Sequence, residues 1–352
     1  MKVGIISYFD YHNYIETNNK QKIYENWHQA WDEVFKLSKK NNIELVKYNY
    51  KDHKKYHKLI FIEIPRINDL LKVLYANIFK KKIFTVLIIN ETFLGRARYM
   101  LNFPYLFNEV LINCEETLRK FLSYKIKTFS YPSIPSKKII EEKKLEILNS
   151  NRKNKLVLIS SFKIALSKHG SYKYKYALVK ELIKNKDLFD LYGFDWDKVP
   201  LPFDVIGIAI IIRVKFLKRF FKFIMNLFYK PLGNFAVVKS KEYTMQNYDF
   251  TLAVEPTISK FNSICEKLFD PMLSGSIPVY YGQNLSENIP ENTYLKINNS
   301  TSAQNISKRL KGITNREKEM YRENIYKFLI SKKADKYRYS TYANLIIKTL
   351  LK

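Results

Sequence analysis

The sequence predicts an α/β fold made of two units of similar size. Short apolar runs with strand character alternate with stretches whose apolar residues recur at helical spacing, and this alternation indicates largely parallel sheets. The 352 residues are enough for two domains, and a hydrophobic content of 46% with 15% aromatics supplies a core for each. We therefore expect one unit at residues 1–150 and a second at 151–352, with a site in a crevice between them.

The first unit begins with an apolar strand at residues 3–7 and an amphipathic helix at residues 24–40. Further strands are expected at residues 43–48, 59–64, 84–89, 109–113 and 127–131, with a helix at 115–122. Residues 136–154 are rich in Lys, Glu and Asn, so we expect the end of this unit and a linker there.

The second unit begins with a strand at residues 155–160. Later strands are expected at 189–192, 250–254 and 277–281, and helices at 172–185, 266–273, 301–310, 315–330 and 342–351. This continued alternation predicts a second, largely parallel sheet.

The charge balance indicates an anionic partner. The chain has 61 Lys and Arg against 33 Asp and Glu, a formal net charge of +28. Such a charge attracts nucleic acid, anionic lipid or phosphorylated substrates. The alternative is a compositional bias that leaves most lysines on a solvated surface.

Cysteine and histidine usage argues against a disulfide framework and a structural metal. The two cysteines, Cys114 and Cys265, lack metal-ligand spacing in their flanks, and the five histidines form no Cys/His cluster. The amino-terminal residues lead directly into a strand without the features of a secretory signal. We therefore expect a cytoplasmic protein.

Residues 204–230 form a basic, aromatic-rich insertion in the second unit. The uninterrupted apolar part is too short to span a bilayer, because cations follow it at positions 213, 215, 218, 219 and 222. A helix of this type can lie on the inner face of the membrane as a peripheral anchor. Alternatively, it packs against the second unit with its cations turned to solvent.

Residues 261–282 carry the strongest functional pattern. Glu266 and Lys267 stand at the start of a predicted helix, Ser274 and Gly275 end it, and a buried strand follows. A helix start offers N–H donors and a positive dipole end to a diphosphate, and Lys267 adds a full charge. The alternative is an exposed ion pair on a first helical turn.

Three segments around this site resemble the donor-binding signature of the α-1,3-fucosyltransferases, glycosyltransferase family 10. They are Tyr248-Asp-Phe-Thr-Leu-Ala-Val-Glu-Pro256, Asn262-Ser-Ile-Cys-Glu-Lys-Leu-Phe-Asp270 and Gly275-Ser-Ile-Pro-Val-Tyr-Tyr-Gly282. The family pattern is Tyr-Lys-Phe-x-x-x-Phe-Glu-Asn, then Tyr-Val-Thr-Glu-Lys, then Gly-x-x-Pro-Val-Tyr-x-Gly, in the same order. Weaker similarities extend over most of the chain, at residues 59–66, 88–91, 107–113 and 191–193.

The resemblance implies a GT-B fold, with two Rossmann-like lobes facing each other across a crevice. Residues 1–150 would bind the acceptor, and residues 151–352 the nucleotide-sugar donor. The implied reaction is an inverting, metal-independent displacement on a GDP-sugar, which in this family is normally GDP-fucose. It needs a base for the acceptor hydroxyl and donors for the departing diphosphate.

The resemblance also assigns roles to individual residues. Glu91 matches the catalytic base, although it could instead cap its own loop. Arg96 and Arg98 follow it and could bind the acceptor or the diphosphate, or only solvate a loop. In the donor lobe, Glu266 matches the ribose-binding Glu and Lys267 the phosphate-binding Lys.

Glu255 matches the Glu beside the transferred sugar, but its surroundings depart from the family pattern. Pro256 replaces an Asn, Ser263 an aromatic residue and Cys265 a Thr. The family's phosphate-binding Arg has no Arg counterpart. The best substitutes are Lys175 and then Lys173, which can neutralise a phosphate but lack the bidentate fork of Arg.

The leading hypothesis is therefore a transferase that moves fucose from GDP-fucose onto a hydroxyl of a glycan or glycolipid, such as an O-antigen of lipopolysaccharide or a capsule glycan. It needs no cofactor and no nucleic acid. One alternative is a GT-B transferase that uses a different nucleotide sugar. Another is a non-catalytic basic protein that binds membrane or nucleic acid, although no nucleic-acid motif supports it.

Overall fold

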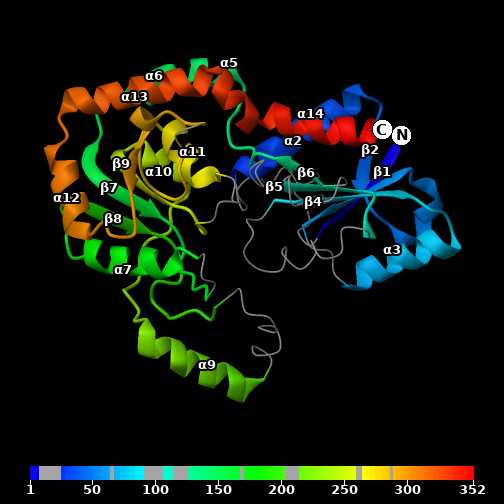
Figure 1. The fold of residues 1–352 in the computed structure, drawn as a ribbon, viewed down its shortest axis with the longest axis horizontal. Helices are drawn as coiled ribbons and strands as arrows, with labels where there is room; N and C mark the ends of the chain where they lie inside the picture. Colours follow the sequence, from blue (N-terminus) through cyan, green and yellow to red (C-terminus); the bar gives the residue numbers. More distant parts are fainter. Residues whose placement is uncertain are drawn as a thin grey trace. The chain divides into compact units, whose positions relative to one another are not determined.

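The structure of the chain is a computed structural model that describes residues 1–7, 25–63, 67–90, 106–113, 126–166, 170–202, 214–258, 264–285 and 288–352. It separates into two compact units (Figure 1). Unit 1 comprises Met1–Ser136, Lys260–Ser263 and Asp335–Lys352, and unit 2 comprises Lys137–Ser259 and Ile264–Ala334. The chain therefore passes into unit 2 and returns to unit 1 at its carboxyl end.

The described part of unit 1 contains one parallel sheet with strand order β2-β1-β3-β4-β5-β6. The strands are β1 (Lys2–Ser7), β2 (Glu44–Lys47), β3 (Lys58–Ile62), β4 (Phe84–Ile89), β5 (Glu109–Asn113) and β6 (Ile126–Phe129). Each apolar run predicted as a strand in residues 1–150 forms one of them. The central strands are buried on both faces, which explains their continuous apolar sequence.

Helices cover both faces of this sheet (Figure 1). Helices α2 (Glu25–Lys40) and α14 (Tyr339–Leu351) share one apolar core with the sheet, and α3 (Ile67–Phe79) contributes to the core on the opposite face. A short 3-10 helix, η1 (Tyr50–Lys55), precedes β3. The predicted helix at residues 115–122 lies outside the described residues.

The carboxyl-terminal helix corrects the predicted domain division. Residues 335–352 were expected in the second unit, but they belong to unit 1. The Tyr342 ring lies 6.4 Å from Trp31 of α2 and 5.2 Å from Phe129 of β6, centroid to centroid. The apolar face of α14 thus completes the core of unit 1, and this long-range packing leaves no local signal in the sequence.

The described part of unit 2 contains a second parallel sheet, with strand order β11-β10-β9-β7-β8. The strands are β7 (Lys153–Ile159), β8 (Phe189–Tyr192), β9 (Tyr248–Val254), β10 (Ile277–Tyr281) and β11 (Leu295–Ile297). The chain runs from β7 outward to β8, then crosses to the other side of β7 for β9, β10 and β11. The strand order therefore reverses between β7 and β9.

The helices of unit 2 are α5 (Lys137–Glu142), α6 (Lys144–Leu148), α7 (Tyr172–Leu182), α9 (Lys215–Phe228), α10 (Lys241–Met245), α11 (Glu266–Leu273), α12 (Ala303–Gly312) and α13 (Asn315–Ile330). Two 3-10 helices, η4 (Glu291–Thr293) and η5 (Lys332–Tyr337), complete the elements. The predicted linker at residues 136–154 is in fact helical over α5 and α6, since Lys, Glu, Ile and Leu favour helix over linker.

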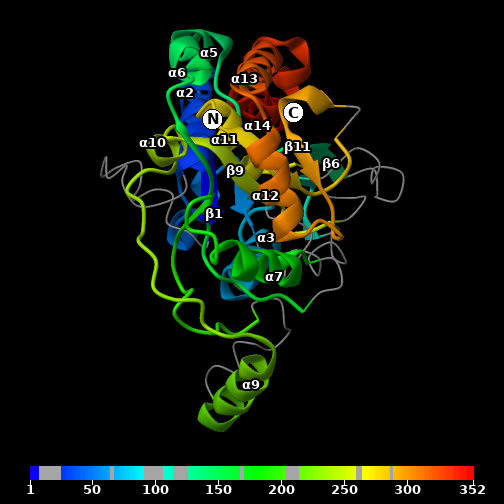
Figure 2. The same ribbon diagram turned by 90° about the vertical axis from the view of Figure 1, so that its left-hand side faces the viewer.

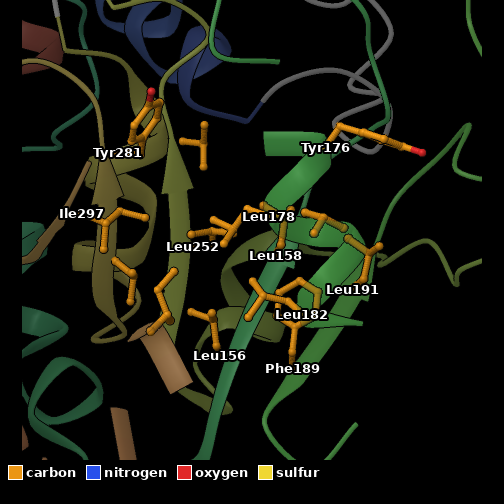
Figure 3. Close-up of a cluster of buried hydrophobic side chains, with 14 of the residues drawn as sticks. Leu156, Leu158, Tyr176, Leu178, Leu182, Phe189, Leu191, Leu252, Tyr281 and Ile297 are labelled. Atoms are coloured by element: carbon orange, nitrogen blue, oxygen red, sulfur yellow. The ribbon is translucent and has the colours of Figure 1, made fainter. Parts of the chain in front are cut away.

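An apolar core joins the sheet of unit 2 to α7 and α12. Figure 3 shows part of it, with Leu156 and Leu158 of β7 beside Leu178 and Leu182 of α7. On the other face, α11 packs against β9 and β10. These contacts fix α7 and α11 relative to the strand ends from which the candidate site is built.

A buried ionic group ties α13 to the sheet of unit 2. Asp249 of β9 is 3% exposed and accepts a hydrogen bond from Lys318 Nζ at 2.7 Å and another from Arg322. Arg322 Nε also donates to the backbone oxygen of Gly275 at 3.1 Å. Because each charge is paired, the group tolerates burial, and loss of one member would leave the others uncompensated.

In the part of the chain that the structure describes, no helix has both the length and the apolar character needed to cross a bilayer.

Candidate functional site

The candidate site lies where the strand order of unit 2 reverses. In an open parallel sheet, ligands bind beyond the carboxyl ends of the strands at this point. Here β7 leads into Ser160 and Ser161, and β9 leads into Glu255. We call the group formed by Ser160, Ser161, Lys175, Glu255, Cys265, Glu266 and Lys267 the switch-point site.

Lys175 reaches this site from the first turns of α7. Its side chain is buried, and Nζ donates to Ser160 Oγ at 3.0 Å and to the backbone oxygen of Ser161 at 3.3 Å. The same Nζ lies 5.0 Å from the centre of the Tyr172 ring. The lysine is therefore held by fixed partners at the end of β7.

The position of Ser160 is itself fixed from the side of β8. Trp196 Nε1 donates to the Ser160 backbone oxygen at 2.7 Å, and Ser160 N donates to Tyr192 O at 2.9 Å. Gly193 has a φ of +137°, and a Cβ there would come within 2.3 Å of the same Ser160 oxygen. Glycine is required at this close approach.

Burial lowers the pKa of Lys175 to about 7, and the positive charges of Lys267 and Lys163 act in the same direction. These effects oppose the cationic form because a charge loses solvation when it is buried, and like charges repel it. Lys175 thus changes its protonation state near neutral pH. An anionic group placed beside Lys175 would raise its pKa and favour the charged form.

Glu255 follows β9 and is 3% exposed. Its carboxyl group accepts hydrogen bonds from Cys265 N at 3.2 Å, Cys265 Sγ at 2.7 Å and Tyr280 Oη at 3.4 Å. Burial raises the pKa of Glu255, whereas the charge of Lys267 and the bonds from Cys265 oppose this rise. The side chain thus anchors the residue that precedes α11.

Glycine at position 282 makes room for this arrangement. A Cβ on Gly282 would lie 2.2 Å from Tyr280 Oη and 2.7 Å from Glu255 Cγ. Gly275, at the stop of α11, has a φ of +69°, and a Cβ there would lie 2.4 Å from the backbone oxygen of Ile147. The two glycines of the quoted motif therefore serve close packing and a left-handed turn.

Glu266 and Lys267 form the first turn of α11, and Cys265 at the N-cap position makes no side-chain capping bond. Lys267 Nζ lies 3.1 Å from Glu266 Oε1, and the two side chains are 35% and 23% exposed. The start of α11 presents its N–H donors, its dipole and Lys267 in one place.

The ionisation of this turn follows from its neighbours. Burial acts to raise the pKa of Glu266, but the charges of Lys267 and Lys241 outweigh it and lower the pKa to about 2. Burial acts to lower the pKa of Lys267, and the nearby acidic groups, Glu266 and Glu255 among them, raise it well above its usual range. Burial raises the pKa of the Cys265 thiol, so the sulfur stays protonated.

Comparison with known proteins concerns the segment that carries part of this site. Residues 212–334 match the family described as "Glycosyltransferase family 10 (fucosyltransferase) C-term". This segment contains Glu255, Glu266 and Lys267, and the resemblance predicted from the sequence is confirmed.

The chain is accordingly a glycosyltransferase, and its residues 212–334 are similar to the carboxyl-terminal part of the family 10 fucosyltransferases. Its fold is similar to "Crystal Structure of alpha1,3-Fucosyltransferase", at 11% identity and a TM-score of 0.52, over 100% of this chain and 90% of that chain. The fold is also similar to "Crystal Structure of alpha1,3-Fucosyltransferase with GDP", at 10% identity and a TM-score of 0.50, over the same shares of 100% and 90%. These likenesses support the predicted GT-B fold.

A UDP-forming α,α-trehalose-phosphate synthase from Burkholderia xenovorans matches at 10% identity and a TM-score of 0.47, over 96% of this chain and 82% of that chain. No curated protein sequence matches the chain.

The structure brings four of the predicted donor residues together in unit 2: Lys175, Glu255, Glu266 and Lys267. Lys173 is exposed on the same helix as Lys175. Residues two apart on a helix point to different sides, so Lys173 does not share the surroundings of Lys175. Of the two predicted substitutes for the family's arginine, Lys175 lies in the switch-point site and Lys173 does not.

Glu91, Arg96, Arg98 and Ser263 lie outside the described residues, and so do Cys114 and the end of the motif at 59–66. Their predicted roles stay predictions. In the described ranges, no three His, Cys, Asp or Glu side chains are grouped so that they could hold a metal ion.

Sequence reasoning missed the supporting residues Ser160, Ser161, Ser171, Tyr172 and Tyr280. Ser171 Oγ, for example, donates to the backbone oxygen of Glu255 from a position 84 residues earlier in the chain. The one available signal was the pair of serines directly after a buried strand, a place where polar residues of parallel sheets gather at a ligand site.

Proposed function

We propose that this glycosyltransferase moves a sugar from a GDP-sugar onto a hydroxyl of a saccharide acceptor by an inverting, metal-independent displacement. Our first candidate for the donor is GDP-fucose, from which L-fucose would be transferred. The observation that carries the proposal is the placement of Lys175 and Lys267 with the start of α11, at the point of unit 2 where strand order reverses. Cations and helix N–H donors of this kind suit a diphosphate leaving group.

Lys175 would neutralise the diphosphate as it binds. With a pKa of about 7, the lysine is only partly protonated near neutral pH. An adjacent phosphate raises the pKa of a lysine, so donor binding would be accompanied by proton uptake. Lys267 is protonated in either case, because its neighbours raise its pKa.

Glu266 and Glu255 would have different tasks. Glu266 is ionised, with a pKa of about 2, and its partly exposed carboxylate can accept hydrogen bonds from ribose hydroxyls. Glu255 already accepts from Cys265 and Tyr280, so we assign it to holding the start of α11. This differs from the sugar contact that the family resemblance implies for it.

Glu91 remains our candidate for the base that takes the acceptor proton, on the strength of the family resemblance alone. A Glu91→Gln variant should lose transfer by at least about a hundredfold, within the range expected for a general base, and keep its affinity for GDP. Transfer at an undiminished rate would show that the base lies elsewhere. Arg96 and Arg98 are proposed to contact the acceptor or the diphosphate.

One observation favours a second candidate function, a transferase with a different nucleotide sugar. In this chain Cys265 occupies the Glu255 carboxyl that the family resemblance places near fucose, and Pro256 replaces an Asn. Both changes affect the sugar end of the site and leave the phosphate end in place. The donor sugar can therefore differ while the diphosphate contacts persist.

The donor is tested by thermal shift with GDP, UDP, GDP-fucose, GDP-mannose and UDP-glucose. Stabilisation by GDP and GDP-fucose supports the first proposal. Stabilisation by GDP and another GDP-sugar, without GDP-fucose, keeps the diphosphate site and changes the sugar. Stabilisation by UDP compounds alone would overturn the GDP proposal in favour of a different nucleotide sugar.

We further propose that the acceptor is a glycan or glycolipid of the O-antigen or capsule type. The protein would then work in the cytoplasm, in peripheral contact with the inner face of the membrane through residues 204–230. The basic charge of +28 supports an anionic surface as a partner.

A further inference from the structure

Helix α9 combines an apolar stripe with a polar face that carries cations and no anion. Its sequence, Lys215–Phe228, contains four cations, at positions 215, 218, 219 and 222, and no Asp or Glu. At 3.6 residues per turn, Phe216, Phe220, Phe223 and Leu227 fall on one narrow stripe. The cations extend from one flank of that stripe, where Arg219 is nearest, to almost the opposite side of the helix, where Lys218 lies.

The stripe is exposed. The exposed fractions are 75% for Phe216, 50% for Phe220, 63% for Phe223 and 63% for Leu227. Scattered apolar side chains on a surface need no explanation, but four in a row on one helix form a patch that indicates a binding surface.

The opposite side of α9 is anchored to unit 2. Met225 and Tyr229 are buried in its apolar core, and Lys230 N donates to Tyr176 Oη of α7 at 2.7 Å. In Figures 1 and 2, α9 stands at the margin of unit 2, beyond α7 as seen from the strands. The sequence left open whether this helix is buried against the second unit. Only one side of it is, and the phenylalanine stripe is left exposed.

The charges decide which partner fits. A second copy of the chain would carry the same cations and the same net charge of +28, so a contact between two α9 helices would bring like charges together. A partner that is apolar inside and anionic at its surface satisfies both faces of the helix. An anionic bilayer has this profile over the few ångströms that an in-plane helix spans.

We propose that α9 lies in the interface of an anionic bilayer, with Phe216, Phe220, Phe223 and Leu227 directed toward the acyl chains. Arg219 and Lys215, the cations nearest to the stripe at 3.6 residues per turn, contact lipid phosphates. Met225 and Tyr229 tether the helix to unit 2, so unit 2 is held at the membrane surface. This inference does not depend on the proposed transfer reaction.

The test is flotation of the full chain with vesicles of phosphatidylcholine alone or with phosphatidylglycerol at three parts in ten. The chain should float with the anionic vesicles and stay behind with the neutral ones. The triple variant Phe216→Ser, Phe220→Ser, Phe223→Ser should bind anionic vesicles at least about tenfold more weakly, because membrane binding scales with buried apolar area. Replacing Lys215 and Arg219 by Gln should weaken binding about tenfold, and salt should weaken it as well.

A matched control is the triple variant Ile78→Ser, Phe79→Ser, Leu145→Ser, which removes three apolar side chains that are 73%, 69% and 84% exposed elsewhere. It should bind vesicles like the wild type.

Equal binding by the α9 variant and the wild type would overturn the proposal, and so would equal binding to neutral and anionic vesicles. A third outcome is that the wild type is a dimer, that the α9 variant is a monomer and that neither binds vesicles. This outcome would overturn the proposal and assign the stripe to a contact with a second copy of the chain. An unfolding temperature equal to that of the wild type verifies that each variant is folded.

Discussion

The lysines of the switch-point site and the cations of α9 carry the same charge in opposite surroundings. Lys175 is 6% exposed and donates to Ser160 and Ser161. The four cations of α9 are all exposed. A cation with fixed protein partners can recognise one anion of defined shape, whereas mobile exposed cations respond to the average field of a surface. Under our two proposals, Lys175 and the cations of α9 would therefore serve different anionic partners.

The largest effect is expected at a third group of charges, the buried pairs that Asp249 forms with Lys318 and Arg322. An Asp249→Asn change leaves Lys318 and Arg322 without their anion, so we expect the free energy of unfolding to fall by about 3–5 kcal/mol. Urea unfolding followed by circular dichroism measures it, with the exposed Asp187→Asn as control. A loss below about 1 kcal/mol would mean that this group is not a structural anchor.

The next effect concerns the cation at the start of α11. A Lys267→Met change should lower kcat/KM by about 10²–10³, because it removes a donor aimed at the charge of the leaving group. Transfer kinetics with the donor identified by thermal shift provide the measurement. The exposed Lys173→Met should stay within about twofold of the wild type, as expected for a surface residue. Equal losses in both variants would remove the distinction between site and surface lysines.

A smaller effect should appear as a function of pH. Because Lys175 has a pKa of about 7, it loses its proton as the pH rises through neutrality, and the diphosphate then meets a neutral amine. The affinity for GDP should fall about fivefold from pH 7 to pH 8, a range in which the terminal phosphate is already ionised. Isothermal titration at the two pH values measures this change. The dependence should vanish in Lys175→Met, and an affinity that rises with pH would contradict the assignment.

The smallest effect separates the two sides of α9. A Phe223→Ser change on the exposed stripe should alter the free energy of unfolding by less than about 0.5 kcal/mol. Truncation of the buried neighbour Met225 to Ala should cost about 2–5 kcal/mol, as for other core side chains. Thermal and urea unfolding of the two variants provide the comparison. Similar losses in both would show that the stripe packs inside the protein.

The sequence predicted the central strands of both sheets because these strands are buried on both faces, whereas it missed the short strand β11. Apolar runs such as 84–89 and 155–160 can hardly form anything else between turn residues. The stop at Gly275 was also predictable, since a left-handed turn favours glycine. The helix α14 was predicted as an element but placed in the wrong unit, because only packing against Trp31 and Phe129 assigns it.

The site was predictable in its charged residues and unpredictable in its supports. Glu255, Glu266 and Lys267 stand in a recognisable local pattern. The hydrogen bonds that hold Glu255 come from Tyr280 and Ser171, which lie 25 and 84 residues away from it in the chain. Such contacts arise only when the strand ends come together, and this also explains why the burial of Lys175, and hence its pKa, had no signal in the sequence.

The measurement that tests the central claim most directly is the affinity for GDP of the wild type, Lys175→Met and Lys173→Met at pH 6.5, determined by isothermal titration. The two substitutions remove the same charge from neighbouring positions of α7. We predict that Lys175→Met binds GDP about tenfold to a hundredfold more weakly, the cost of one charged hydrogen bond, and that Lys173→Met binds like the wild type. Equal affinities for all three proteins would contradict a diphosphate site at the strand ends of β7 and β9.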